Sequence, residues 1–145
     1  SSFSIARSEL LEPRTCEFAM VNPQRQGLEA RFAWMAVTAA PTGNAPLQAI
    51  EKLDLVSGER LVWSAAPRGF VSEPVMVPKP CPAAADGSSE DGFSEDSGWL
   101  LCLVWNGARC ASDLVILDAA SLDEVAVLEL PLAVPHGLHG SWAPA

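Results

Sequence analysis

The chain has 145 residues, of which 49% are hydrophobic, and a formal net charge of −9. A chain of this length and apolar content can bury a core and is not intrinsically disordered. Nine Lys and Arg residues against 18 Asp and Glu leave no basic patch for a phosphate backbone, so we expect no nucleic-acid partner. No apolar run approaches the roughly 18 residues that a membrane-spanning helix needs.

Short apolar runs of strand length follow one another along the chain, separated by Gly, Pro, Asp and Ser. This pattern, together with weak helical periodicity, predicts an all-β chain of antiparallel strands. In chain order, the expected strands are residues 17–21, 30–37, 49–56, 59–65, 73–77, 98–105, 112–119 and 124–130. Trp63, Trp99 and Trp105 lie on these runs, and we expect them to pack in the core.

Two stretches have the composition of β-hairpins. "KLDLVSGERLVW" contains a strand, a polar turn in which Gly58 is free to take positive φ, and a returning strand. "VILDAASLDEVAVL" repeats the order of strand, Asp, turn and strand, with Asp54 and Asp118 in matching places. The match indicates two copies of a larger unit.

A longer repeat contains these hairpins. "CEFAMVNP" and "SEPVMVPKP" each hold an acidic residue followed by Met-Val and a proline, and their glutamates, Glu17 and Glu73, are 56 residues apart. Each heads a series of four strands, as do the blades of a β-propeller, whose first strands line the central channel. A third unit would begin near His139, 66 residues after Glu73. The period predicts antiparallel four-stranded blades with these three side chains facing one axis.

The acidic stretch at residues 78–98 is the longest expected connection. It is rich in carboxylates but lacks the alternating Asp/Asn pattern and terminal Glu of a calcium-binding loop. We therefore predict a mobile, solvated acidic loop between two strands.

The four cysteines, Cys16, Cys81, Cys102 and Cys110, lack C-x-x-C spacing, which favours neither a zinc site nor a redox pair. We expect them to be reduced, mostly buried thiols of an intracellular protein. The sequence does not distinguish a plastid from the cytoplasm.

Both histidines of the chain, His136 and His139, lie in "VPHGLHGSW". They are either surface residues of a frayed tail or metal ligands whose partners lie on another part of a longer polypeptide. The first methionine is Met20, inside an apolar stretch, and we expect the chain to be a portion of a longer protein. Residues three apart on a strand point to opposite faces, and the neighbouring Pro135 and Gly137 oppose a helix, so we do not expect His136 to be a second ligand.

Six stretches in this order resemble a known family: "CEFAMVNPQRQG", "EKLDLVSGERLVW", "SEPVMVP", "DGFSEDSGWLLCLVWN", "SDLVILDAASLDEVAVLELP" and "VPHGLHGSW". They are similar to the C-terminal part of the carotenoid cleavage oxygenases, which include carotenoid, apocarotenoid and stilbene-cleaving dioxygenases and the retinoid isomerase of the eye. The resemblance covers nearly the whole chain. It implies that residues 1–145 form about two blades, plus the start of the closing one, of a seven-bladed β-propeller.

The resemblance also implies a metal site. Members of the family hold one ferrous iron on the propeller axis with four histidines. By position, His139 matches the last of these ligands, and Glu17 and Glu73 match glutamates that accept hydrogen bonds from ligand histidines. The other three histidines and a third glutamate would lie outside this chain. The chain departs from the family pattern at Ala19, where proline is usual, and at His136, where an aromatic or small residue is commoner.

Histidine and glutamate suit this chemistry for physical reasons. A neutral imidazole binds Fe(II) without adding negative charge, and a carboxylate beside its second ring nitrogen fixes the tautomer and the ring orientation. The resemblance thus implies a non-haem Fe(II) dioxygenase that uses O2 to split a conjugated C=C bond of an apolar carotenoid or apocarotenoid into two carbonyl products.

We expect this chain alone to have no activity, because one imidazole does not retain iron and the rest of the propeller is needed to close the sheets. Two alternatives stay open. One is a non-catalytic β-propeller that acts as a binding module, and the other is a fragment that complements a separate N-terminal chain. Association with a membrane surface through the remaining blades also stays open.

Overall fold

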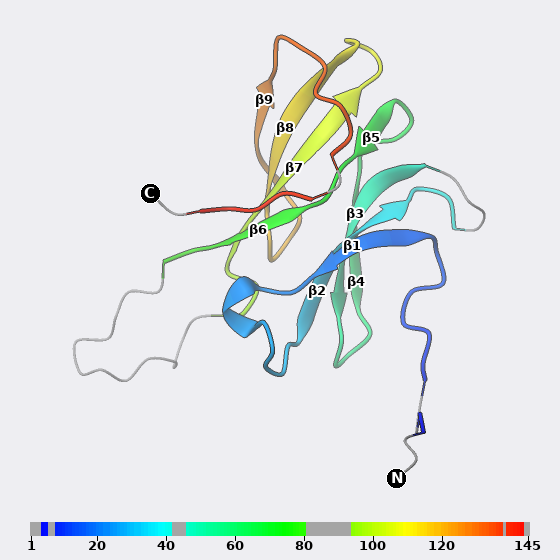
Figure 1. Ribbon diagram of the computed structural model, residues 1–145, viewed down its shortest axis with the longest axis vertical. Coiled ribbons are helices and arrows are strands. Elements are labelled where there is room, and N and C mark those ends of the chain that lie inside the picture. The colour runs from blue at the N-terminus through cyan, green and yellow to red at the C-terminus, as the bar shows by residue number, and fades with distance from the viewer. Residues whose placement is uncertain (1–3, 6–7, 42–45, 81–93, 138, 144–145) are drawn as a thin grey trace.

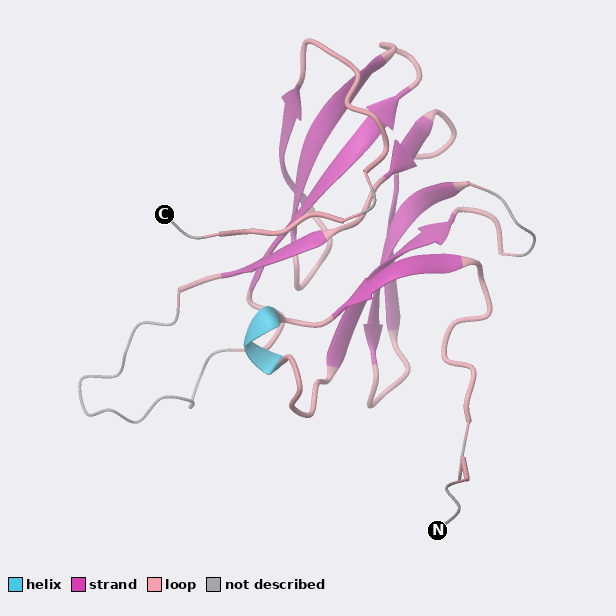
Figure 2. Cartoon of the chain, viewed as in Figure 1, coloured by secondary structure: helices cyan, strands magenta, loops and turns pink. Residues whose placement is uncertain are grey.

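The computed structural model describes residues 4–5, 8–41, 46–80, 94–137 and 139–143. Within these residues the chain forms nine strands in two antiparallel sheets, joined mostly by loops (Figures 1 and 2). A short 3-10 helix, η1 (Pro23–Arg25), follows the first strand. No helix in the described part of the chain is long and apolar enough to cross a membrane.

Sheet A consists of four strands that are neighbours both in sequence and in space. They are β1 (Cys16–Met20), β2 (Phe32–Thr38), β3 (Leu47–Asp54) and β4 (Arg60–Ser64). Alternate residues of β2 point to opposite faces, so that Trp34 joins the core between the sheets while Met35 joins a second cluster on the far face. Because both of its faces are buried, β2 is apolar along almost its whole length.

Sheet B is built from β5 (Gly69–Val71), β6 (Val75–Pro78), β7 (Gly98–Asn106), β8 (Ala111–Asp118) and β9 (Glu124–Glu129). β7, β8 and β9 pair in sequence order, and both β5 and β6 pair with β7. β5 pairs with residues 104–106 and β6 with residues 98–101 of the same strand. β5 and β6 are therefore two halves of one edge strand that is interrupted around Glu73.

The all-β, antiparallel prediction is confirmed, and in each sheet a first strand at one edge, continuous in sheet A and interrupted in sheet B, is followed by three successive partners. β5 and η1 were not predicted. β5 has only three residues and follows Pro67, and η1 is a single turn, so neither leaves a periodic pattern in the sequence. That the two sheets are blades of a seven-bladed propeller stays a prediction.

Both predicted hairpins form, and their turns have the same hydrogen bonds. In the β3–β4 turn, Asp54 Oδ1 accepts bonds from the N–H groups of Val56 and Ser57, at 2.9 and 3.1 Å. In the β8–β9 turn, Asp118 Oδ1 accepts bonds from the N–H groups of residues 120 and 121, at 2.9 and 3.2 Å. The repeat seen in the sequence therefore extends to the individual bonds of the turns.

The core between the two sheets contains residues from both. Its members are Trp34, Ala36, Ile50, Val71, Met76, Leu100, Cys102, Val104, Val115, Leu117, Ala119 and Leu122. The Trp34 side chain is fully buried, and its Nε1–H donates to the Ala119 carbonyl at 3.0 Å, which ties β2 to the end of β8.

The three tryptophans expected in the core, Trp63, Trp99 and Trp105, are only half-buried. Trp63 packs at the edge of the core, and its Nε1–H donates to Glu124 Oε1 at 2.9 Å. The expectation thus holds in part for Trp63, which packs against the core, while Trp34, which was not singled out from the sequence, is the tryptophan that is fully buried in it.

The far face of sheet A carries a buried charge cluster. The Glu51 side chain on β3 is fully buried and forms an ion pair with Arg14, which precedes β1. Arg60 Nε lies 3.5 Å from Glu51 Oε1 and 3.6 Å from Glu12 Oε2. Two arginines thus offset two buried carboxylates, which holds residues 12–14 against the sheet.

Most of the predicted acidic loop, residues 81–93, lies outside the described residues. Its C-terminal end is anchored to sheet A: Glu95 Oε1 accepts a bond from the Phe32 N–H at 2.9 Å, and Asp96 forms a buried ion pair with Lys52 at 2.5 Å. Lys52 Nζ also donates to the Ala120 carbonyl at 2.8 Å. Lys52 therefore links sheet A to two segments of sheet B, the one that precedes β7 and the turn between β8 and β9.

The three cysteines in the described part of the chain are all free thiols, and Cys81 lies outside it. Cys102 is buried, Cys16 is half-buried and Cys110 is exposed. The prediction of reduced thiols fits these three, but the prediction of mostly buried thiols holds only for Cys102. Burial raises the pKa of the Cys102 thiol to about 12.

Candidate metal-ligand site

The segment that leads to His139 is anchored on sheet B. Ser112 of β8 donates its N–H to the Leu132 carbonyl at 3.0 Å, and its carbonyl accepts the Leu130 N–H at 2.9 Å. Its hydroxyl oxygen accepts the Val134 N–H at 2.9 Å. The segment then turns back alongside β6 (Figure 1). It is held to the sheet by these bonds, unlike the frayed tail that the sequence left open.

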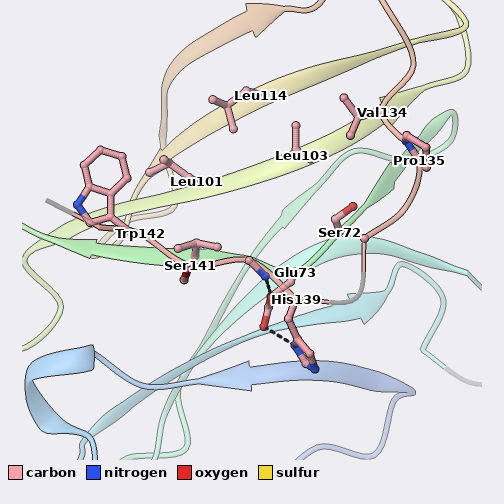
Figure 3. Close-up of a pocket in the computed structure, with 13 residues that line it drawn as sticks. Ser72, Glu73, Leu101, Leu103, Leu114, Val134, Pro135, His139, Ser141 and Trp142 are labelled. Atoms are coloured by element: carbon pink, nitrogen blue, oxygen red, sulfur yellow. Dashed lines mark hydrogen bonds and ion pairs between the residues drawn. The ribbon is translucent and has the colours of Figure 1, made fainter. Parts of the chain in front are cut away.

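His139 and Glu73 form the centre of the site. His139 Nδ1 lies 3.2 Å from Glu73 Oε1, and the backbone N–H of Gly140 donates to Glu73 Oε2 at 2.5 Å. Figure 3 shows both contacts as dashed lines, with the imidazole reaching from the C-terminal segment towards β1. One carboxylate thus holds both the ring of His139 and the backbone next to it.

The interruption between β5 and β6 explains why Glu73 can hold both groups. Residues 72–74 lie between β5 and β6, where Pro74 cannot donate a ladder bond. The Glu73 side chain is 20% exposed, and its carboxylate reaches the C-terminal segment across the break in the strand. A regular, uninterrupted strand would instead pair with β7 at this position as well.

The bond to Glu73 leaves one nitrogen of His139 available. A carboxylate acceptor beside Nδ1 favours the tautomer that carries its proton on Nδ1, so Nε2 keeps its lone pair. The His139 side chain is 71% exposed, so Nε2 is accessible to a ligand from outside the chain. No group of three or more His, Cys, Asp or Glu that could hold a metal ion occurs among the described residues.

Phe18 of β1 is a third member of the site. Its ring meets the His139 ring edge to face, with centroids 6.0 Å apart and an angle of 88° between the planes. Phe18 has a φ of +59°, a left-handed conformation that costs an ordinary side chain about 1–2 kcal/mol. Phe18 was not predicted as a site residue, because nothing in "CEFAM" indicates a left-handed backbone at a phenylalanine.

The remaining predicted site residues lie as follows. Glu17 is exposed on β1, next to Phe18, and its carboxylate makes no hydrogen bond or ion pair with Glu73 or His139 in the described structure. His136 is also exposed. The structure therefore brings Glu73 and His139 together, and the roles predicted for all three site residues stay predictions.

A cavity of about 250 Å³ opens beside the His139–Glu73 pair, between the C-terminal segment and sheet B. Figure 3 shows that Leu101, Leu103 and Leu114 line its floor. These leucines lie on the face of sheet B opposite the core, whose members on β7 are Leu100, Cys102 and Val104. The apolar cavity thus lies on the outer side of the sheet.

Comparison with known families matches residues 2–144 to the retinal pigment epithelial membrane protein family, RPE65. The chain belongs to the RPE65/carotenoid cleavage oxygenase family. It is 44% identical over 137 residues to the apocarotenoid-15,15'-oxygenase of Synechocystis, covering 93% of this chain and 26% of that enzyme. It is 33% identical over 144 residues to a carotenoid cleavage oxygenase of Mycobacterium tuberculosis, covering 94% of this chain and 26% of that protein.

Solved structures show the same relationship. The crystal structure of cobalt-substituted Synechocystis ACO matches with a TM-score of 0.85 and 44% identity, over 94% of this chain and 27% of that one. The crystal structure of an ACO/RPE65 chimera matches with a TM-score of 0.85 and 42% identity, over the same shares of the two chains. The chain thus spans about a quarter of the length of these relatives, and its two sheets match part of their structure.

Proposed function

We propose that the protein containing this chain is a non-haem Fe(II) dioxygenase that cleaves a conjugated C=C bond of a carotenoid or apocarotenoid. The observation that carries the proposal is the Glu73 carboxylate, which holds Nδ1 of His139 and the Gly140 N–H while Nε2 stays free. Family membership supports the reaction class, and the cobalt in a solved relative supports a divalent metal.

The described residues fit one ligand position of a metal site. His139 would supply one neutral imidazole through Nε2, and Glu73 would fix its tautomer and raise its basicity. Glu17 would do the same for a ligand histidine that lies outside this chain. Iron bound by four imidazoles would supply the O2 activation that turns one C=C bond into two C=O bonds, both oxygen atoms coming from O2.

On this proposal the isolated chain is inactive, because three further imidazoles are required. The substrate is an apolar polyene, and the remainder of the protein is needed to enclose it. A plastid or cytoplasmic location stays a prediction. One relative, the carotenoid cleavage dioxygenase 7 of Arabidopsis thaliana, is described as chloroplastic.

The proposal is tested in the full-length protein with Glu73→Gln, Glu17→Gln and His139→Ala. Glutamine keeps the size of each glutamate but weakens the acceptor, so we expect each glutamine variant to lose about 10–100-fold in iron affinity or in turnover of an apocarotenoid. Elemental analysis and product chromatography measure the two quantities. Glu29→Gln, at an exposed position away from the site, is the matched control.

Three results would count against the proposal. Glu73→Gln and His139→Ala proteins with wild-type iron content would remove the assigned roles. A full-length protein without iron or turnover would favour a non-catalytic binding module. Cleavage of an apocarotenoid by the purified chain alone would show that the chain does not need the rest of the protein.

A further inference from the structure

The contact between Phe18 and His139 joins the two sheets at the candidate site. Phe18 lies on β1 of sheet A, whereas Glu73 and the C-terminal segment belong to the side of sheet B. The His139 ring therefore touches sheet B through a hydrogen bond and sheet A through an aromatic ring.

We propose that Phe18 is a positioning residue that fixes the plane of the His139 imidazole, and that the irregular pairing of β1 exists to place it there. This inference rests on the proposed function, because it assigns His139 as the metal ligand.

The irregularity of β1 is a bulge. Glu17 pairs with Ala36 and Met20 pairs with Trp34, so two residues of β1, Phe18 and Ala19, stand opposite one residue of β2. Such a bulge lets successive residues point to the same face of a sheet. The left-handed φ of Phe18, +59°, lies at this bulge.

The pairing register shows to which face of sheet A these residues point. Directly paired residues of antiparallel strands project to the same side, and Ala36 and Trp34 both belong to the core between the sheets. Phe18 packs against that same core. Glu17 and Phe18 are therefore both placed on the side of β1 that faces sheet B, where His139 lies. Strict alternation would have sent one of them to the far face.

The hydrogen bond to Glu73 is not enough to orient His139. The orientation of the ring depends on two torsion angles, χ1 and χ2, whereas one hydrogen bond at Nδ1 restrains a single distance, so a coupled rotation about both torsions still changes the direction of Nε2. The edge-to-face contact at 88° supplies a second restraint on the ring. Because the His139 side chain is 71% exposed, few other contacts with the described residues restrain it.

The test uses the full-length protein and three variants. Phe18→Leu removes the ring but keeps a large apolar side chain, Phe18→Met is a second, more flexible replacement, and Phe18→Tyr retains the ring. Phe70→Leu is the matched control, because Phe70 pairs with Trp105 on sheet B, with centroids 5.7 Å apart, and does not contact His139.

Two measurements are made, and neither needs turnover. Competition with a chelator gives the affinity for Co²⁺, and the visible absorption of the Co²⁺-loaded protein reports the geometry of its ligands. We expect Phe18→Leu and Phe18→Met to bind Co²⁺ about 3–10-fold more weakly, with a shifted spectrum. Phe18→Tyr and Phe70→Leu should keep the wild-type affinity and spectrum.

A folded Phe18→Leu or Phe18→Met protein with wild-type Co²⁺ affinity and spectrum would overturn the inference. Loss of affinity in Phe70→Leu to the same degree would also overturn it, since the effect would then reflect general packing. Glu73→Gln and His139→Ala separate the two levels of the proposal. If these weaken Co²⁺ binding and the Phe18 variants do not, only the positioning role fails. If neither Glu73→Gln, His139→Ala nor the Phe18 variants weaken Co²⁺ binding, the proposed function fails.

Discussion

Gly58 and Leu122 occupy the same place in the two equivalent turns, and both have a left-handed backbone. Their φ angles are +76° and +62°. Glycine takes this conformation without cost, whereas a leucine does so only when another interaction offsets the strain. Leu122 is 5% exposed and belongs to the core, so burial of its side chain supplies that interaction.

Gly58→Ala should lower the free energy of unfolding of the full-length protein by about 1–2 kcal/mol. Nothing lies within 4 Å of a Cβ added at Gly58, so the whole effect comes from its positive φ. Urea denaturation measures the change. Gly137→Ala is the control, because it also has open space but no left-handed φ, and it should leave stability nearly unchanged. Equal effects at the two glycines would contradict this explanation.

The described cysteines differ in reactivity because they differ in burial. Burial raises the pKa of the Cys102 thiol to about 12, which disfavours the reactive thiolate near neutral pH, and the side chain is also inaccessible. Cys110 is exposed. In the native protein we expect iodoacetamide to modify Cys110 and to spare Cys102 until urea unfolds the chain. Mass spectrometry of the digested protein measures this, and rapid native labelling of Cys102 would show that the core opens easily.

At the scale of single elements, the hairpin turns depend on their first residue. Asp118→Ala removes the acceptor for two backbone N–H groups and should destabilise the full-length protein by about 1–2 kcal/mol. Asp118→Asn keeps an oxygen at that position and should retain most of the stability. Urea midpoints of the two variants separate the effects, and equal losses would mean that the negative charge matters more than the hydrogen bonds.

The sequence predicts elements well where a local pattern exists. Asp54 and Asp118 begin turns whose chemistry depends on neighbouring residues, so the sequence is sufficient to find both hairpins. Glu73 and His139 were found through a repeat and a family motif. Pro74 marks a lost ladder bond between β5 and β6, but the break itself depends on how one edge strand pairs with two parts of β7, which no local pattern indicates.

Contacts between sheets were also beyond prediction. Phe18 meets His139 across 121 positions of the chain, and Lys52 meets Asp96 across 44. Asp96 lies in the stretch that was predicted to be a mobile loop, since composition describes its acidity and not its partner. Such pairs become visible only when the packing of distant strands is known.

At the scale of the whole molecule, Lys52 links the sheets. Burial alone would raise the pKa of the Asp96 carboxyl, but hydrogen bonds from Lys52 and Ser94 and the charge of Lys52 outweigh it, and the pKa lies below its ordinary value of 3.8. A lowered pKa in the folded state contributes stability above the unfolded pKa. That contribution is lost as the pH falls through the folded value.

Asp96→Asn should therefore destabilise the full-length protein most at neutral pH. Breaking a buried ion pair costs about 3 kcal/mol, and Lys52 is left without its partner. As the pH falls below about 5, we expect the difference in urea midpoint between wild type and variant to shrink, because the unfolded carboxyl takes up a proton before the folded one, whose pKa is lower. A difference that stays constant across this range would show that Asp96 stabilises the protein by packing and not by charge.

The two edge strands that carry the glutamates singled out from the sequence depart from regular pairing beside them, one by a bulge and one by an outright gap. For protein engineering this means that copying the side chains alone would not reproduce the arrangement. An idealised β-scaffold given the same glutamate and histidine would aim them in other directions. A designer would have to import the two backbone defects first and choose the residues afterwards.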